Sequence, residues 1–268
     1  MDSKFFRYSF GFLVFLLILL AFYYECSVLK MIISIFLIIG AIKEYREMFK
    51  QKEINVHKFV PEIFGILFAL IFCFPLNQYA HEMVTPLFIA GIITSFLVTI
   101  IRNKKPYFIT SLATIMSFLM VFCGLYVIKI TYQFVIDKCW YIILAYFFAI
   151  LLGDFIASKV GPKFTKKLAP EISPNKTIGG AIANLITSCL VCSLLVFFVN
   201  FSIFECLFFG FVISIFAQIG DLSISSIKRD LGIKHSGNMF LEYGGILDRM
   251  DAFIFSAPAA YYCLCLFS

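Results

Sequence analysis

Apolar stretches long enough to cross a lipid bilayer recur along almost the whole of this 268-residue chain. A spanning helix needs about 20 predominantly apolar residues, and in lipid such a segment is helical because its backbone groups must bond internally. The chain is 62% hydrophobic and only 14% charged, which is far from the composition of a soluble domain. The pattern therefore predicts an all-α fold, a polytopic transmembrane helical bundle.

Nine candidate spans account for most of the chain. Span one is interpreted as a retained anchor, because no convincing small-residue cleavage site follows it. We interpret the chain as a single integral membrane domain, with N-terminal spans in 1–58, middle spans in 59–152 and motif-bearing C-terminal spans and loops in 153–268. The nine spans are 9–26, 28–42, 60–77, 84–101, 108–128, 139–157, 177–199, 203–220 and 250–267.

Basic residues are unevenly divided between the two sides that these spans define. The N-terminus and alternate loops hold 19 of the 22 lysines and arginines, whereas the other side holds only Lys30, Lys129 and Lys138. By the positive-inside rule this predicts a cytoplasmic N-terminus. The net charge of +6 is then mainly topological, and nucleic acid is not expected as a partner. We expect a bacterial inner membrane protein whose polar stretches 153–180 and 220–251 face the cytoplasm.

One polar constellation combines GDLSISSIKRDLGIKHSGN, residues 220–238, with YGGILDRMD, residues 243–251. If the first part is helical, its acid, serine and lysine lie on one face at i, i+4 and i+7. The two aspartates of the second part are three residues apart, so their carboxylates can also point one way. The paired glycines allow the backbone to approach a ligand closely. The residues concerned are Asp221, Ser225, Lys228, Asp248, Asp251, Gly244 and Gly245.

These residue types together favour phosphate chemistry. Carboxylates suit magnesium, which prefers oxygen ligands and is often shared with substrate phosphates, and Lys228 and Arg229 can clamp phosphate oxygens. The combination fits phosphoryl or nucleotidyl transfer, where positioning and charge neutralisation dominate catalysis. The competing interpretation is an ordinary stop-transfer flank, in which basic residues pair with the acids. Ionisable groups at membrane depth are costly, which favours a functional role for the three aspartates.

A second constellation, GDFIASKVGPKFTKKLAPEISPNKTIGG, spans residues 153–180. We interpret its lysine-rich part as a topogenic loop and 173–177 as a turn leading into the next span, whose helix N-terminus can receive an anion. Asp154 and Lys176 are better functional candidates because each sits at a span boundary. A weaker feature, Lys43–Arg46, is interpreted as an interfacial belt of ion pairs.

These motifs resemble the phosphatidate cytidylyltransferase family, also called CDP-diacylglycerol synthases. SSIKRDLGIKHSGN with GGILDRMD is similar to the family's C-terminal signature, and LAPEISPNKT is similar to its upstream stretch. The two regions cover about a quarter of the chain. The resemblance implies synthesis of CDP-diacylglycerol and pyrophosphate from CTP and phosphatidate with magnesium, with assistance from a monovalent cation such as potassium, and it implies a homodimer.

The resemblance also implies roles for individual residues. Asp221, Asp248 and Asp251 would be the metal-site carboxylates, and Lys228 and Arg229 would bind phosphate, so that these five form the catalytic set. The residues expected to bind substrate are Ser173, Lys176, Thr177, Ser225, Lys234, Gly244, Gly245 and Arg249.

The chain departs from the family pattern at several positions beside the motifs. His235 follows the second lysine where the family has aspartate, Tyr243 precedes the glycines where it has histidine, and Gly179 stands where it often has an acid. The alternatives are therefore a CTP-dependent enzyme acting on another lipid, of the polyprenol kinase or archaeol cytidylyltransferase type, and a degenerate, non-catalytic paralogue. A transporter would instead place its acids near mid-membrane.

Overall fold

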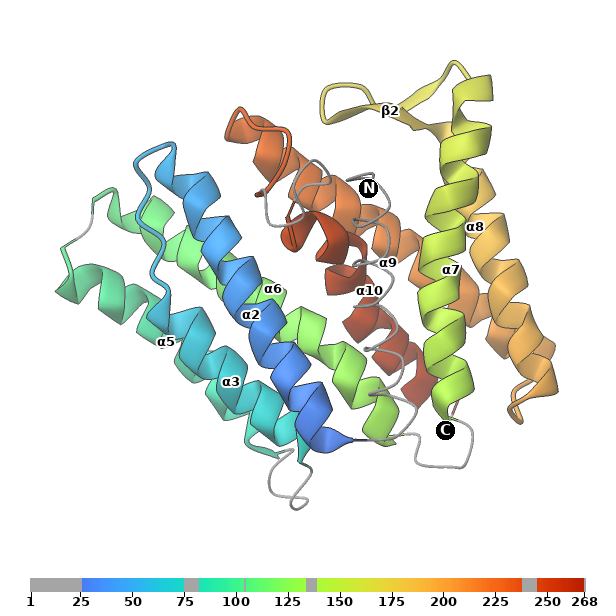
Figure 1. Cartoon of the computed structure of the whole chain (residues 1–268), viewed down its shortest axis with the longest axis horizontal. Coiled ribbons are helices and arrows are strands. Elements are labelled where there is room, and N and C mark those ends of the chain that lie inside the picture. Colours follow the sequence, from blue (N-terminus) through green and yellow to red (C-terminus); the bar gives the residue numbers. More distant parts are fainter. Residues whose placement is uncertain (1–25, 75–81, 104, 134–138, 238–244, 268) are drawn as a thin grey trace, which may run out of the picture. The chain divides into compact units, whose positions relative to one another are not determined.

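The structure is a computed structural model that describes residues 26–267 apart from 75–81, 104, 134–138 and 238–244. It is built almost entirely from helices (Figure 1). The principal helices are α2 (Ser27–Lys50), α3 (Phe59–Cys73), α5 (Val84–Ile101), α6 (Tyr107–Gln133), α7 (Cys139–Val160), α8 (Ile178–Ser193), α9 (Ile203–Asp230) and α10 (Leu247–Cys265), and the short 3-10 helices are η1 (Gly161–Lys163) and η2 (Leu194–Phe197).

The prediction of a purely helical chain misses one small sheet. Strands β1 (Lys167–Ala169) and β2 (Ser173–Thr177) form an antiparallel hairpin, with Lys167 opposite Thr177 and Ala169 opposite Ser173. The residues interpreted as a turn are therefore the second strand of this hairpin. Figure 1 shows the hairpin at one end of α7 and α8.

Among the described residues, five helices are long and apolar enough to cross a membrane, so the chain is an integral membrane protein. These helices are α5, α6, α7, α8 and α9, and they coincide with five of the predicted spans. Span 60–77 falls on the shorter apolar helix α3, span 28–42 on α2 and span 250–267 on α10. Span 9–26 lies outside the described residues except for its last residue, Cys26. The count of nine and the cytoplasmic N-terminus stay predictions.

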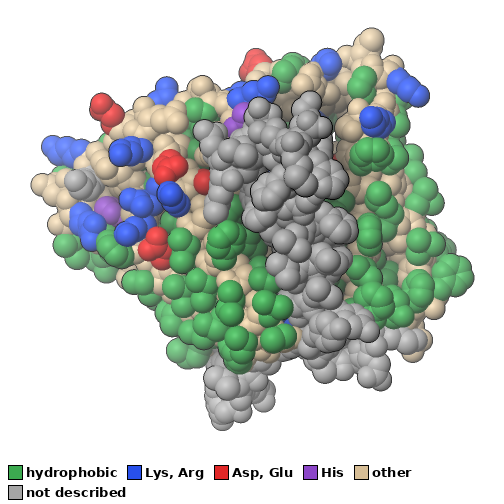
Figure 2. All heavy atoms as spheres, in the orientation of Figure 1, with side chains coloured by type: hydrophobic (Ala, Val, Ile, Leu, Met, Phe, Trp, Pro, Cys, Tyr) green, Lys and Arg blue, Asp and Glu red, His purple; other side chains and the backbone are tan. Residues whose placement is uncertain are grey.

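The apolar surface of the spans matches this role. Many large hydrophobic side chains on α5, α7 and α8 are exposed, including Ile101, Phe155 and Leu190. In a soluble protein, exposing such side chains to water would be unfavourable, whereas lipid tails are a suitable surrounding for them. On the face drawn in Figure 2, green side chains cover the α7–α8 part, and lysine or arginine side chains gather at its hairpin end.

The chain divides into two compact units. The first contains the described residues up to Ile128 together with His235–Leu247, and the second contains the described residues of Lys129–Lys234 and Asp248–Ser268. The first unit is held by a cluster of aromatic rings from α3, α5 and α6. Phe118 lies at its centre, with its ring centroid 5.4 Å from that of Phe88 and 6.1 Å from that of Phe68.

The second unit is built on close packing of α7, α8 and α9. At Gly210 of α9, an added Cβ would lie 2.6 Å from the carbonyl oxygen of Ser188 and 2.7 Å from Cα of Cys189. Small residues of this kind allow helix backbones to approach one another in membranes. Helix α10 joins α7 through Tyr146, whose hydroxyl lies 2.8 Å from that of Ser256.

Helix α9 is longer than the predicted span 203–220. It begins at a capping box, in which the Ser202 hydroxyl accepts from the Glu205 backbone N–H and the Glu205 carboxylate accepts from that of Ser202. It ends at Asp230, and Gly232 follows with a φ of +76°, a conformation that glycine adopts without strain. The ten additional residues carry much of the polar motif, so this motif is helical.

We predict that Gly210→Ala destabilises the protein, because the new methyl group meets the backbone of α8 and not a movable side chain. Overpacking of this kind typically costs about 1–3 kcal/mol. Thermal unfolding of the purified protein in detergent measures the loss. The matched control is Gly124→Ala in α6, where an added Cβ meets nothing within 4 Å. Equal melting temperatures for the two variants would contradict the prediction.

Candidate functional site

The polar end of α9 forms the base of the candidate site. Asp221, Ser225 and Lys228 are on one helix face, as predicted for a helical motif, and the Ser225 hydroxyl donates to the Asp221 carboxylate at 3.2 Å. Ser225 and Lys228 are buried. Three polar side chains are therefore held on the side of α9 that packs inside the second unit.

Strand β2 brings a lysine to this face. The Lys176 ammonium donates to the Asp221 carboxylate, and both side chains are partly exposed. The next residue, Thr177, is buried and acts as the N-cap of α8: its hydroxyl accepts from the Gly180 backbone N–H at 3.1 Å and donates to the Gly161 carbonyl at 2.9 Å. The cap fixes the end of the strand, and this places Lys176 beside α9.

The first turn of α10 contributes the two remaining acids. The Lys228 ammonium donates to the Asp248 carboxylate at 2.6 Å, and their side chains are only 9% and 10% exposed. Asp251 lies one turn later, and its carboxylate accepts from the Ala252 backbone N–H. The predicted pair of acids is therefore present on one helix, but Asp248 is engaged by a lysine.

Glycine permits the contact that brings α9 and α10 together. A Cβ at Gly220 would overlap the backbone carbonyl oxygen of Asp251. Since Asp221 is the next residue, this close approach places its carboxylate near that of Asp251, and the two interact electrostatically. Lys176 and Lys228 also act on Asp251 by their charge. Together with Asp248, which is paired with Lys228, three acids and two lysines thus form one charged cluster.

Asp154 of α7 belongs to the same cluster. Its carboxylate interacts electrostatically with Asp221 and Lys176, and it accepts a 2.9 Å hydrogen bond from the Asn184 side chain of α8. Asn184 is itself buried and accepts from the Ser214 hydroxyl of α9 at 2.7 Å. This chain of hydrogen bonds links three helices and orients Asp154. The sequence indicates Asp154 as a functional candidate because it lies at the boundary of a predicted span.

The remaining predicted residues lie around this cluster or elsewhere. Arg229 is exposed, and its guanidinium donates to the carbonyls of Ile172 and Ile233, so it connects the hairpin to the end of α9.

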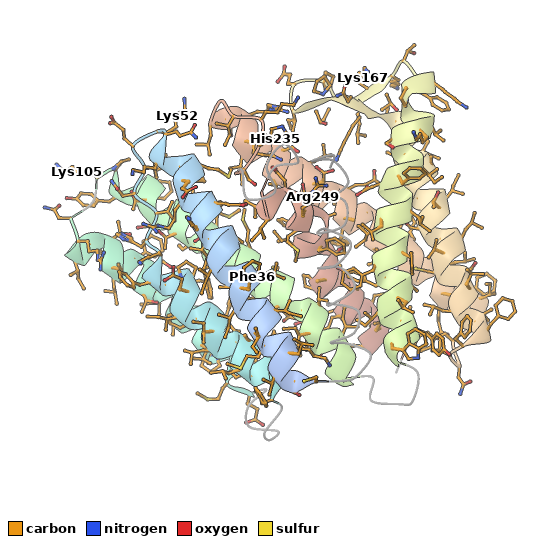
Figure 3. All side chains as sticks on the ribbon, in the orientation of Figure 1. Phe36, Lys52, Lys105, Lys167, His235 and Arg249 are labelled. Carbon is orange, nitrogen blue, oxygen red and sulfur yellow. The ribbon has the colours of Figure 1, made fainter. Side chains whose placement is uncertain are left out.

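The other residues expected to bind substrate are spread over several elements. Lys234 is exposed and Ser173 lies in β2. Arg249 is exposed in the first turn of α10, and Lys167 projects from the hairpin (Figure 3). Gly245 is buried in the first unit, and Gly244 lies outside the described residues.

Position 179 has a steric explanation for its glycine. A Cβ there would overlap the ring of Phe164, which follows η1 in the loop before the hairpin. No larger residue fits at 179 while Phe164 keeps its place. The missing acid of the family pattern is thus linked to a packing contact.

The donor set suits a magnesium ion in part. The carboxylates of Asp221 and Asp251 interact electrostatically, and such a pair is stabilised by a cation because like charges repel. Within the described residues, however, no three histidine, cysteine, aspartate or glutamate side chains are grouped as a complete metal cage. Magnesium is usually bound by one or two carboxylates together with substrate phosphates, so two acids are a sufficient protein contribution.

One interpretation of the sequence is wrong. Lys43–Arg46 was expected to form no more than an interfacial belt of ion pairs, yet Glu44 is 4% exposed and accepts backbone hydrogen bonds from Ile246 and Leu247. The sequence around Glu44 does not predict this burial, because its hydrogen-bond partners Ile246 and Leu247 lie about 200 residues further along the chain.

Fold and site together define a helical integral membrane protein with a lysine–carboxylate cluster suited to phosphate chemistry. The model of the cytidylyltransferase family matches residues 5–267, and the chain belongs to this family.

Relatives named phosphatidate cytidylyltransferase are similar over most of their length. That of Staphylococcus haemolyticus strain JCSC1435 is 36% identical over 235 residues, covering 85% of this chain and 86% of the relative. That of Staphylococcus aureus strain COL is 33% identical over 255 residues, covering 92% of each. That of Bacillus subtilis strain 168 is 28% identical, covering 83% of this chain and 84% of the relative.

We predict energetic coupling between Lys228 and Asp248. Lys228→Met removes the cation beside a buried carboxylate, and breaking a buried pair in this way costs about 3–5 kcal/mol. Adding Asp248→Asn removes the charge as well and recovers part of the loss. Thermal or denaturant unfolding of both single variants and the double variant measures the coupling. Strictly additive losses would contradict the pairing.

Proposed function

We propose that this protein transfers a cytidylyl group from CTP to phosphatidate, giving CDP-diacylglycerol and pyrophosphate. The observation that carries the proposal is the cluster of Asp221 and Asp251 with Lys176 and Lys228, because it combines phosphate-binding cations with carboxylates suited to magnesium. Membership of the cytidylyltransferase family and the names of the relatives support this substrate pair.

The reaction requires positioning more than a protein nucleophile. The phosphate of phosphatidate is mostly dianionic near neutral pH, since the second pKa of a phosphomonoester is about 6. One of its oxygens attacks the α-phosphorus of CTP, a new P–O bond forms, and the bond from the α-phosphorus to the bridging oxygen breaks. Both electrons of that bond leave with pyrophosphate, so no proton has to be removed by the protein.

The lysines supply charge where the reaction develops it. Lys176 and Lys228 each donate to a carboxylate in the described structure. Phosphate oxygens are alternative acceptors for the same ammonium groups, so substrate binding exchanges one anionic partner for another. The Ser225 hydroxyl donates to the Asp221 carboxylate oxygen that Lys176 does not contact. Preorganised charges of this type stabilise a transition state without reorganisation at the moment of reaction.

Asp221, Asp251 and Asp248 are the residues that would hold a magnesium ion. When bound, the ion would supply positive charge to the phosphate oxygens of the nucleotide. Potassium as a second ion and a homodimer stay predictions from the family resemblance.

The acyl chains of phosphatidate remain in the bilayer while its headgroup meets CTP at the polar ends of the helices. We propose that these ends face the cytoplasm of a bacterial inner membrane. The uneven distribution of lysine and arginine supports this orientation, because basic loops are retained on the cytoplasmic side.

Asp221→Asn is predicted to lower cytidylyl transfer by about 100-fold or more, since it removes a charge from the centre of the cluster. The assay follows incorporation of labelled CTP into lipid with phosphatidate and magnesium. Asp230→Asn is the matched control, because Asp230 is exposed at the end of the same helix. Near wild-type incorporation by Asp221→Asn would refute the role of the cluster.

Removal of divalent metal by a chelator is predicted to abolish transfer, and added magnesium is predicted to restore it. Equal activity with and without the chelator would contradict the metal proposal.

Product analysis in the same assay separates the alternative functions. A nucleotidyl lipid supports the proposal, a bare lipid phosphate indicates a kinase, and no CTP binding indicates a non-catalytic paralogue.

A further inference from the structure

Glu44 is a buried carboxylate far from the motif residues in the sequence. It lies in α2, in the first unit, and is 4% exposed. Its Oε1 accepts from the Ile246 backbone N–H at 2.8 Å, and its Oε2 accepts from the Leu247 backbone N–H at 3.0 Å and the Ser236 hydroxyl at 3.2 Å. Three donors therefore converge on one carboxylate, which is how a buried acid is satisfied.

The two backbone donors mark the start of α10. The helix begins at Leu247, so the N–H groups of Ile246 and Leu247 have no acceptor within the helix. A carboxylate at this end satisfies these groups and also matches the positive end of the helix dipole. In this protein the carboxylate comes from another helix and not from a neighbouring capping residue.

Two glycines leave room for the Glu44 side chain. An added Cβ at Gly237 would lie 2.9 Å from the Glu44 carboxyl carbon, and one at Gly245 would overlap the carboxylate itself. Gly245 is the second glycine of the pair before DRMD. Its role here is to permit an approach of the acid, which any larger residue would block.

Asp248 follows Leu247 directly, and Asp251 lies one turn further along the same helix. We propose that Glu44 is a positioning residue for cytidylyl transfer, because it fixes the backbone at which the turn bearing these two aspartates begins. The inference rests on the proposed function, and it assigns to α2 a part in the reaction that the motif residues alone do not indicate.

Glu44→Gln tests the role with an almost isosteric change. The glutamine amide offers one acceptor oxygen, and its NH₂ group faces a backbone N–H, where two donors meet. We expect kcat to fall by about 10–100-fold, the scale of a misplaced catalytic group. Glu47→Gln is the matched control, because Glu47 is exposed on the same helix; we expect it to keep wild-type activity.

Hydrogen exchange provides a readout that does not depend on activity. Peptides containing the amides of Ile246 and Leu247 are expected to exchange faster in Glu44→Gln than in the wild type, and at the wild-type rate in Glu47→Gln. Peptides from α3 and α5 serve as internal references for general destabilisation. Faster exchange throughout the chain, with an unchanged kcat per folded molecule, would show a merely structural role and would overturn the proposal.

A second pair of variants covers the case in which Glu44→Gln folds poorly. Gly245→Ala is expected to reduce transfer in the wild type, because the new methyl group meets the Glu44 carboxylate. In a Glu44→Ala background the same change is expected to cause little further loss, and additive losses would contradict the contact. An inactive wild type would instead refute the proposed function itself, whereas an active wild type with fully active Glu44→Gln overturns the positioning role alone.

Discussion

The close contact between α9 and α10 at Gly220 is the constraint on which the charged cluster depends. Only a residue without a Cβ lets the carbonyl of Asp251 approach α9 so closely. With the helices in contact there, Asp221 comes near Asp251, and Lys228, two turns later on α9, reaches Asp248 at the start of α10. Most of the site is thus formed where α9 and α10 pack together at Gly220, and Lys176 from the hairpin completes it.

Ion pairs and hydrogen bonds help to explain how this cluster is tolerated in so apolar a chain. The pairs Lys176–Asp221 and Lys228–Asp248 each join side chains from different elements, and the Asn184 amide donates a hydrogen bond to Asp154. Buried charges without such partners would be strongly destabilising. The same pairs keep the ammonium groups close to where an anionic substrate would bind, so stability and the proposed chemistry use the same side chains.

The sequence predicted local features well and distant contacts poorly. Spacing placed Asp221, Ser225 and Lys228 on one helix face, because an i, i+4, i+7 pattern depends only on helix geometry. It did not show that β2 would carry Lys176 to Asp221, since strand pairing in so short a hairpin leaves little periodic signal. The burial of Glu44 was missed for a related reason: nothing near it in the chain indicates a partner at residues 246 and 247.

The packing of Phe164 against Gly179 also restricts how this protein can change. An acid at 179 cannot enter while the phenyl ring occupies that space. A larger residue at 179 therefore requires that the Phe164 ring turn away or that a smaller residue replace it. The effect of a substitution at 179 thus depends on the residue at 164, and the two positions are coupled through a single ring.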